Sequence, residues 1–301
     1  MKVKKIGIVS LSSGILGEDF VSHEVKIGIE RLKKYGIEVS FINYQNLEEL
    51  EATIKDNTAM IYIETPSNPL LKVSDIKAIV EIAKRHSIRT VADNTFMTAL
   101  YQKPLDLGCD IVIESLTKFV NGHSDVTAGC AVTNNEEIAE EICLLQKNFG
   151  GILGVEDAWL ILRGMKTMGL RMEKSVENAK ILTKFLESQD KIKKVYYPNL
   201  TSCKFYDIHT EQASSGGAVF SFEFFEQADL KMFLKKIKIP IYAISLGGVE
   251  SIISHPATMS HACMSEEERL AQGVTQTLLR FSCGVEDAED LIEDLTQALT
   301  D

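Results

Sequence analysis

The sequence predicts an α/β protein with a mostly parallel central sheet and a smaller α+β domain at its C-terminal end. Short apolar runs alternate with amphipathic stretches over the first half of the chain, and few residues separate them. Strand–helix–strand units with short connections form parallel sheets that are flanked by helices. The last third changes character, because its strand-like runs alternate polar and apolar residues as half-buried strands do.

The expected strands are short runs rich in isoleucine, valine and, near the end, phenylalanine. They lie at residues 6–9, 60–64, 89–93, 109–113, 217–224 and 278–282. A helix that Ser74 can cap has Ile76, Ile79, Val80 and Ala83 on one face. Further helices are expected at 136–147, at 156–187 as one long and bent helix, and from about residue 287.

Composition excludes several classes of protein. A net charge of −11 argues against a nucleic-acid or anionic-membrane surface as the main partner. The six cysteines are scattered and form no CxxC pair, which favours free thiols in a reducing compartment over a disulfide framework or a zinc site. We recognise neither a signal peptide nor an apolar run long enough to span a bilayer, and we therefore expect a cytoplasmic protein.

The segment 114–125 is the first chemical signal. Lys118 follows the apolar run 109–113 closely, Ser115 and Thr117 precede it, and a glycine turn comes after it. Ligands bind at the carboxyl ends of the strands in open α/β sheets, and a desolvated lysine there can attack a carbonyl as a free amine. The alternative is a solvated lysine at a strand end.

Asp93 is the second signal, since it ends the strand 89–93 and should lie at the same edge as Lys118. A surface acid or a helix cap is the alternative, although no obvious helix follows residues 93–96. A lysine that can form an imine, together with an aspartate that keeps a ring nitrogen protonated, is what a pyridoxal phosphate site requires. The hydroxyls of Ser115 and Thr117 would then bind the cofactor phosphate.

From about residue 41 to the end, the chain resembles the cystathionine-type, Cys/Met-metabolism family of pyridoxal phosphate enzymes. Five motifs carry this resemblance in the family's order: Glu64-Thr-Pro-Ser-Asn-Pro69, Asp93-Asn-Thr-Phe96, Ser115-Leu-Thr-Lys-Phe-Val-Asn-Gly-His-Ser-Asp125, Ser245-Leu-Gly-Gly-Val-Glu-Ser251 and Leu279-Arg-Phe-Ser-Cys-Gly-Val-Glu-Asp287. The resemblance implies a fold-type I, aminotransferase-like architecture whose sheet is truncated at its amino-terminal side. It also implies a homo-oligomer, either a dimer or a tetramer.

The resemblance assigns a role to each residue on the cofactor side of the site. Lys118 would be the Schiff-base lysine and the general acid and base, and Asp93 would pair with the pyridine nitrogen. Ser115 and Thr117 would hold the phosphate, and Asn68 would lie near the ring hydroxyl.

On the substrate side, the resemblance implies that Arg280 clamps the α-carboxylate of a sulfur amino acid with its bidentate fork, helped by Ser245. A strand arginine in a surface ion pair is the alternative for Arg280. The implied reaction is trans-sulfuration, in which a β or γ substituent is eliminated or replaced. Ile244 stands where several γ-specific relatives carry glutamate, which favours a cystathionine β-lyase or a methionine γ-lyase-like activity over γ-lyase; γ-synthase remains open.

Residues 1–40 resemble instead the first strand and helix of an LD-carboxypeptidase-type serine peptidase. We therefore expect three parts: a foreign segment 1–40, the rest of the cofactor-binding domain at 41–170, and a C-terminal α+β domain at 171–301, with a join near Ser40–Phe41. The family's phosphate cup, its ring-stacking tyrosine and its inter-subunit arm have no counterpart that we recognise in the sequence. The backbone amides of the turn at 12–14 could meet an anion, but a plain strand–helix turn is the preferred interpretation, and a phosphate held by two hydroxyls without helix amides would be bound much more weakly. An inactive chimera and, on residues 1–40 alone, an LD-carboxypeptidase are the alternative functions.

The remaining polar residues give weaker signals. We expect His123 to bond the local backbone, and His255 and His261 to line the substrate pocket. Neither histidine of this pair has the carboxylate or cysteine partners of a metal site. The glutamates of the 136–147 helix should form a solvated face.

Overall fold

The first half of the chain forms a six-stranded sheet in the order β2-β1-β3-β4-β5-β6. The computed structural model describes residues 7–10, 30, 33–34, 36–42, 46–260, 262 and 264–300. The strands are β1 (Gly7–Ser10), β2 (Glu38–Phe41), β3 (Thr58–Glu64), β4 (Arg89–Asp93), β5 (Ile111–Ser115) and β6 (Gly129–Val132). All neighbouring pairs are parallel except β5 and β6. The predicted mostly parallel sheet is therefore confirmed.

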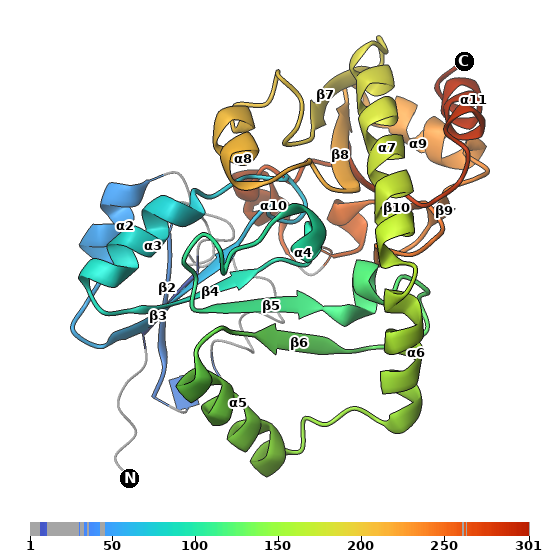
Figure 1. Cartoon of the computed structure of the whole chain (residues 1–301). Coiled ribbons are helices and arrows are strands. Elements are labelled where there is room, and N and C mark those ends of the chain that lie inside the picture. Colours follow the sequence, from blue (N-terminus) through green and yellow to red (C-terminus); the bar gives the residue numbers. More distant parts are fainter. Residues whose placement is uncertain are drawn as a thin grey trace.

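Helices cover both faces of this sheet (Figure 1). On one face, α2 (Leu47–Thr53) and α3 (Ile76–Arg85) bury a core with the isoleucines of β3, and on the other Ile138 of α5 (Glu136–Phe149) packs against β4 and β5. The prediction that Ser74 caps α3 was wrong. Asp75 is the N-cap, and its carboxylate accepts a hydrogen bond from Ala78 N.

Two helices in succession lead from the first sheet to the C-terminal half (Figure 1). They are α6 (Val155–Met165) and α7 (Met168–Glu187), so the one long helix predicted over 156–187 is broken at Lys166–Thr167. Gly164 lies near the end of α6, where a Cβ atom would fall 2.3 Å from the carbonyl oxygen of Asn121. The glycine therefore lets α6 touch the loop that follows Lys118.

The C-terminal half contains a five-stranded sheet in the order β7-β8-β11-β10-β9. Its elements are β7 (Ile192–Tyr196), α8 (Tyr206–Gln212), β8 (Val219–Phe224), α9 (Gln227–Lys236), β9 (Ile241–Tyr242), β10 (Ile252–Ser254), η2 (Pro256–Thr258), α10 (Glu266–Gln272), β11 (Leu278–Ser282) and α11 (Ala288–Leu299). Strand β8 was predicted to be half-buried, and this was wrong. Phe220, Phe222 and Phe224 pack into the domain core, whereas the opposite face is covered by the first half, where Ser221 Oγ bonds Pro69 O at 2.6 Å.

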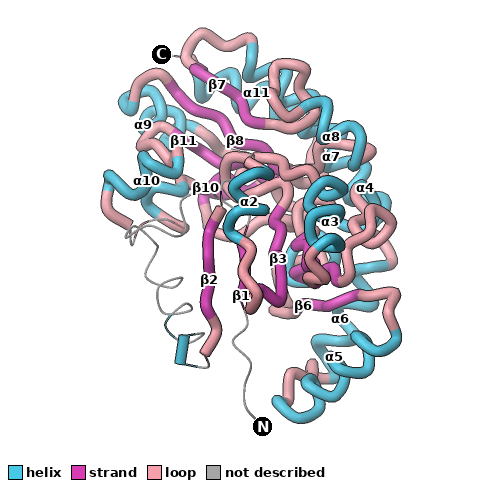
Figure 2. The backbone as a smooth tube through the Cα atoms, turned by 90° about the vertical axis from the view of Figure 1, so that its left-hand side faces the viewer, coloured by secondary structure: helices cyan, strands magenta, loops and turns pink. Residues whose placement is uncertain are grey.

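The remaining elements are short, and in the sequence they lie between strands of the first sheet. Helix α4 (Thr98–Tyr101) follows β4, and the π-helical turn η1 (Leu116–Val120) follows β5. Strand β1 lies between β2 and β3, so β2 forms the edge of the sheet (Figure 2). Strand β2 runs across the predicted join at Ser40–Phe41 and pairs with β1 on both sides of it. Within the described residues, every helix is too short or too polar to traverse a lipid bilayer.

Candidate active site

Three adjacent strands end in ionisable or hydroxyl side chains at one edge of the first sheet. Glu64 ends β3, Asp93 ends β4 in register with it, and Ser115 ends β5. Lys118 lies in the turn η1 directly after β5. The predicted placement of Asp93 and Lys118 at the same carboxyl edge is thereby confirmed, because parallel neighbours end on one side.

Lys118 is partly buried, and its Nζ donates to Ser245 Oγ at 2.8 Å. Burial first, and then the nearby charge of Arg280, lowers the pKa of Lys118. The lysine departs from helical geometry inside its turn, with φ −93° and ψ −134°. Gly247, at φ +82°, brings the 245–248 loop against this turn, since a Cβ atom there would lie 2.6 Å from Phe119 N. The lysine is thus held between two chain segments in a form that loses its proton more easily.

Arg280 lies in β11, and its side chain reaches the same place. Its Nη1 donates to Asn68 Oδ1 at 2.9 Å, and its Nη2 donates to Ser245 O at 2.7 Å and to Ser254 Oγ at 3.0 Å. Its exposed fraction is only 5%, so the surface ion-pair interpretation was wrong. Burial lowers the pKa of Arg280 to about 10.

The Nε atom of Arg280 is buried and has no hydrogen-bond partner in the structure. A buried unsatisfied donor on a cationic group needs an acceptor, and a carboxylate is the acceptor that a guanidinium fork binds best. This donor is therefore an observation in favour of a carboxylate ligand.

Asn68 reaches the site from the loop after β3. Its backbone N donates to Glu64 Oε1 at 2.9 Å, while its side chain is engaged by Arg280. Burial first, and the neighbouring Asp93 less strongly, raises the pKa of Glu64 to about 7. The structure therefore places the Asn68 side chain against Arg280, and its predicted position beside a cofactor hydroxyl stays a prediction.

Asp93 is held through both carboxylate oxygens. Oδ1 accepts from Thr95 N at 3.0 Å, and Oδ2 accepts from the Tyr62 hydroxyl at 3.1 Å. Burial first, and then the Asp93 charge, raises the pKa of Tyr62, so the phenol stays a proton donor. Tyr62 was not among the predicted site residues, although the period-2 pattern of β3 puts its side chain on the same face as Glu64.

The two predicted phosphate hydroxyls have different surroundings. The backbone N of Ser115 donates to Thr95 Oγ1 at 2.9 Å, which ties it to the Asp93 turn. Thr117 Oγ1 donates to Ala128 O at 3.2 Å and accepts from Ala128 N at 2.9 Å. Thr117 would have to release Ala128 O to donate its hydrogen to a phosphate. The turn at 12–14 lies outside the described residues.

Arg171 was also missed, although it supports the lysine turn directly. From α7 it donates to Phe119 O at 2.8 Å, to Val120 O at 3.2 Å and to Gly164 O at 2.9 Å. Its hydrogen bonds in the described structure go to backbone carbonyls and to Thr167 Oγ1. The arginine thus ties both the lysine turn and the end of α6 to α7. No sequence pattern points to Arg171, because backbone carbonyl groups, which every residue carries, are its partners in the lysine turn.

The lesser candidates take mostly structural positions. The prediction for His123 is confirmed, since its Nδ1 lies 2.6 Å from Asn121 O. His255 is buried and bonds Thr258 Oγ1 and Gln276 O, whereas His261 lies outside the described residues. The acids of α5 are exposed as expected, and Glu141 pairs with Arg89 at 3.0 Å.

Comparison with known proteins decides the family. The model of the Cys/Met metabolism PLP-dependent enzymes matches residues 22–300. The chain belongs to that family. The match begins before residue 41, so it includes residues 22–40 of the segment predicted to be foreign.

The most similar relatives include two enzymes of Bacillus subtilis. Cystathionine beta-lyase MetC is 46% identical over 285 residues, which cover 95% of this chain and 73% of the relative. Cystathionine gamma-lyase is 42% identical over 285 residues, which cover 95% of this chain and 75% of the relative. Among solved structures, cystathionine gamma-lyase from Lactobacillus plantarum, complexed with L-serine, superposes with a TM-score of 0.91 at 35% identity and covers 99% of this chain and 76% of that one. The fold-type I architecture is thereby confirmed.

The residues at this edge fit the pyridoxal phosphate on which the family depends. Asp93, fixed by two donors, can hold a protonated ring nitrogen, and Lys118, with its lowered pKa, can supply an amine. The unsatisfied Nε of Arg280 suits the carboxylate of an amino acid beside it.

Proposed function

We propose that the chain cleaves or replaces a carbon–sulfur bond in a sulfur amino acid, with Lys118, Asp93, Ser115, Thr117 and Asn68 on the cofactor side and Arg280 and Ser245 on the substrate side. The single observation that carries the proposal is the link through Ser245. Its hydroxyl accepts from Lys118 Nζ, and its carbonyl accepts from Arg280 Nη2. One residue thus joins the candidate base to the candidate carboxylate clamp.

Bound pyridoxal phosphate supplies an aldehyde that takes up the substrate amino group and a ring that accepts electrons from the α-carbon. Asp93 keeps the ring nitrogen protonated, and the Tyr62 hydroxyl and Thr95 N hold its carboxylate in place. Arg280 binds the α-carboxylate of the substrate, which brings the α-carbon near Lys118. Because burial lowers its pKa, Lys118 has a larger neutral fraction and can take the α-proton.

For the reaction itself we propose β-elimination, as in a cystathionine β-lyase. Ile244, beside Ser245, is 70% exposed and borders a cavity of about 460 Å³. Ile241 and Ile252 line the same cavity together with polar residues that include Asp125 and Glu250, so a thioether chain would have apolar contacts and an amino acid's charged groups polar ones. γ-Lyase, methionine γ-lyase-like and γ-synthase activities are the alternatives.

Product analysis with L-cystathionine tests the reaction type. β-Elimination gives homocysteine, pyruvate and ammonia, whereas γ-elimination gives cysteine, 2-oxobutyrate and ammonia. We expect pyruvate. A product mixture dominated by 2-oxobutyrate would overturn the β assignment and leave the family assignment intact.

Cofactor titration separates the enzyme from an inactive relative. Wild-type protein mixed with pyridoxal phosphate should show the visible absorption of lysine-bound cofactor, and Lys118→Ala should lose it. Lys166→Ala, an exposed lysine at the end of α6, is the matched control. If saturated wild-type protein shows no such band, the inactive alternative replaces the proposal. The LD-carboxypeptidase alternative would need hydrolysis of a murein tetrapeptide, which we do not expect.

We also propose that the protein is a homo-oligomer. Apolar side chains on α5, on α6 and on the connection between them are more than half exposed: Leu144, Leu145, Phe149, Ile152, Val155, Trp159 and Leu162. Large apolar side chains exposed in number on neighbouring elements are typical of contact sites between protein molecules. Sedimentation velocity should give at least a dimer, and Trp159→Glu with Leu162→Glu should shift it toward monomer. A wild-type monomer at micromolar concentration would refute this.

A further inference from the structure

The loop between β9 and β10, residues 245–251, is fastened to one continuous segment of the chain. That segment is β11 with the turn after it, and the residues of it that bond the loop include Arg280, Ser282, Gly284 and Glu286. Alternate residues of a strand lie on one face, and here the alternation continues past the end of β11. Phe281 and Cys283, which lie between these residues, pack into the domain core instead. The substrate clamp and the fastenings of the loop therefore belong to one series of residues.

Glu286 makes the last of these fastenings with both of its carboxylate oxygens. Oε1 accepts from Ser251 N at 2.5 Å, and Oε2 accepts from Ser251 Oγ at 2.8 Å. The Ser251 hydroxyl also accepts from Gly284 N at 2.9 Å, so its single hydrogen is directed to the carboxylate. Ser251 is buried, and hydrogen bonds to a charged acceptor are stronger than those between neutral groups. Glu286 thus fixes the end of the loop that leads into β10.

Helix α7 holds the Glu286 segment in its turn. The side-chain amide of Asn178, which is buried in the middle of α7, donates to Gly284 O at 3.1 Å and to Glu286 O at 2.8 Å. A Cβ atom at Gly284 would collide with Val249 O, so the glycine lets this segment lie directly against the loop. The carboxylate of Glu286 is therefore presented from a backbone that is itself held in place.

Ser245, at the other end of the loop, has a strained backbone. Its φ is +85°, a region that costs free energy for a residue with a Cβ atom and that persists only where surrounding contacts impose it. In this conformation its hydroxyl accepts from Lys118 Nζ at 2.8 Å and its carbonyl accepts from Arg280 Nη2 at 2.7 Å. If the loop relaxed, Ser245 would leave its strained conformation and both contacts would be weakened.

We propose that Glu286 is a positioning residue for the active site. Through Ser251 it holds the loop in place, and it thereby keeps Ser245 on the lysine and on the clamp. Within the described structure, the hydrogen bonds of the Glu286 carboxylate all go to Ser251, so it acts on the site only through the loop. The proposal rests on the function proposed above, because it concerns the same site, but its first test needs neither cofactor nor substrate.

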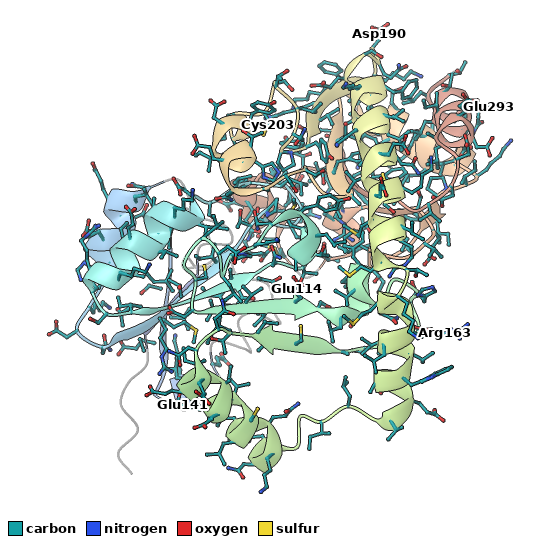
Figure 3. The ribbon with its side chains drawn as sticks, viewed as in Figure 1. Glu114, Glu141, Arg163, Asp190, Cys203 and Glu293 are labelled. Atoms are coloured by element: carbon teal, nitrogen blue, oxygen red, sulfur yellow. The ribbon has the colours of Figure 1, made fainter. Side chains whose placement is uncertain are left out.

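Amide hydrogen exchange of the cofactor-free protein tests whether Glu286 holds the loop. Glu286→Ala removes both bonds to Ser251, so a peptide that covers residues 245–251 should exchange about tenfold faster than in wild type. Glu286→Gln keeps an acceptor for Ser251 N and should lie between the two. Glu293→Ala is the matched control, because Glu293, labelled in Figure 3, is an exposed glutamate of α11. Equal exchange in wild type and Glu286→Ala would overturn the proposal.

Steady-state kinetics of the pyridoxal phosphate-loaded protein with L-cystathionine separate positioning from plain stability. The sum of pyruvate and 2-oxobutyrate is measured, so the result does not depend on β or γ chemistry. We expect Glu286→Ala to lower kcat about tenfold, because Lys118 is no longer held, and to raise KM about threefold, because Arg280 loses the Ser245 carbonyl. Glu293→Ala should change neither constant.

The same substitution in a Ser245→Ala background gives the decisive comparison. The hydroxyl that contacts Lys118 is already absent there, so Glu286→Ala should no longer lower kcat but should still raise KM. A fall in kcat of the same size in both backgrounds would show a merely structural role and overturn the proposal. If the loaded wild type forms no 2-oxo acid at all, the proposed function fails, whereas the exchange experiment still decides whether Glu286 holds the loop.

Discussion

Replacing Arg171 by methionine should destabilise the protein by about 2 kcal/mol, although the side chain is absent from the motifs that define the site. The guanidinium donates to the carbonyls of Phe119, Val120 and Gly164, at 2.8, 3.2 and 2.9 Å. Gly164 O also accepts from Thr167 N and from Thr167 Oγ1, so the substitution leaves the other two carbonyls unsatisfied, at about 1 to 2 kcal/mol each, which sums to about 2 to 4 kcal/mol. Burying the Arg171 cation itself costs free energy, and this cost is why burial lowers its pKa. Methionine removes that cost, which offsets part of the loss and favours the low end of the range.

The assay is urea unfolding followed by circular dichroism, with Arg163→Met as the control. Arg163, labelled in Figure 3, lies one helix earlier and is exposed. Its Cζ lies 5.7 Å from the ring centre of Trp159. Its loss should cost about 0.5 to 1 kcal/mol. Arg171→Lys should fall between the two, because an ammonium group cannot reach all three carbonyls in a fixed fork.

The Lys118 turn supplies the functional readout for Arg171. Two of the three carbonyl groups that Arg171 binds, those of Phe119 and Val120, directly follow Lys118. Arg171→Met should therefore also bind pyridoxal phosphate more weakly, whereas Arg163→Met should not. If Arg171→Met and Arg163→Met differ by less than about 0.5 kcal/mol in unfolding free energy, the view that Arg171 supports the turn is refuted.

Three further predictions concern the carboxyl edge of the sheet. Tyr62→Phe removes one of the two donors that hold Asp93, so pyridoxal phosphate affinity should fall about tenfold by absorbance titration; unchanged affinity would argue against that role. The folded-state pKa of Glu64 is raised from 4.5 to about 7, so ionisation of this group destabilises the fold progressively as pH rises between these values. Glu64→Gln should therefore gain about 3 kcal/mol relative to wild type between pH 4.5 and 8, and a pH-independent difference would contradict this. Gly247→Ala, which puts a Cβ atom 2.6 Å from the lysine turn at φ +82°, should lower kcat, while Gly151→Ala, with nothing within 4 Å, should not.

The local motifs of the site could be predicted from the sequence, but the contacts between them could not. Lys118 and Asp93 were placed at one edge because each follows a recognisable apolar run. The bond between Asn68 and Arg280 joins residues 212 positions apart, and it depends on how β11 faces the loop after β3. No periodicity in either segment contains that information.

The errors about β8 and the α3 cap have one physical cause. A strand with alternating residues was expected to have one exposed face, but the first half of the chain covers the second face of β8. Ser74 was expected to cap α3, but its backbone N bonds Thr65 Oγ1, its carbonyl accepts from Gln212 Nε2 of the C-terminal half at 3.0 Å, and its own hydroxyl is buried without a partner. Both positions are set by packing between the two halves, which a local pattern does not record.

The strand at residues 38–41 bears on the predicted foreign origin of residues 1–40. Strand β2 pairs in register with β1 through Val9↔Ser40 and Ser10↔Phe41, one partner on each side of the predicted join (Figure 2). The ladder of a parallel pair is made by backbone groups, so two sequences of different origin can share one strand when both favour extended structure. A continuous strand is therefore compatible with either origin, and the foreign origin stays a prediction, even though the family match begins at residue 22. Reading the gene across the codons for residues 38–44 would decide whether the junction exists in the genome, because an assembly error would vanish on resequencing and a fusion would not.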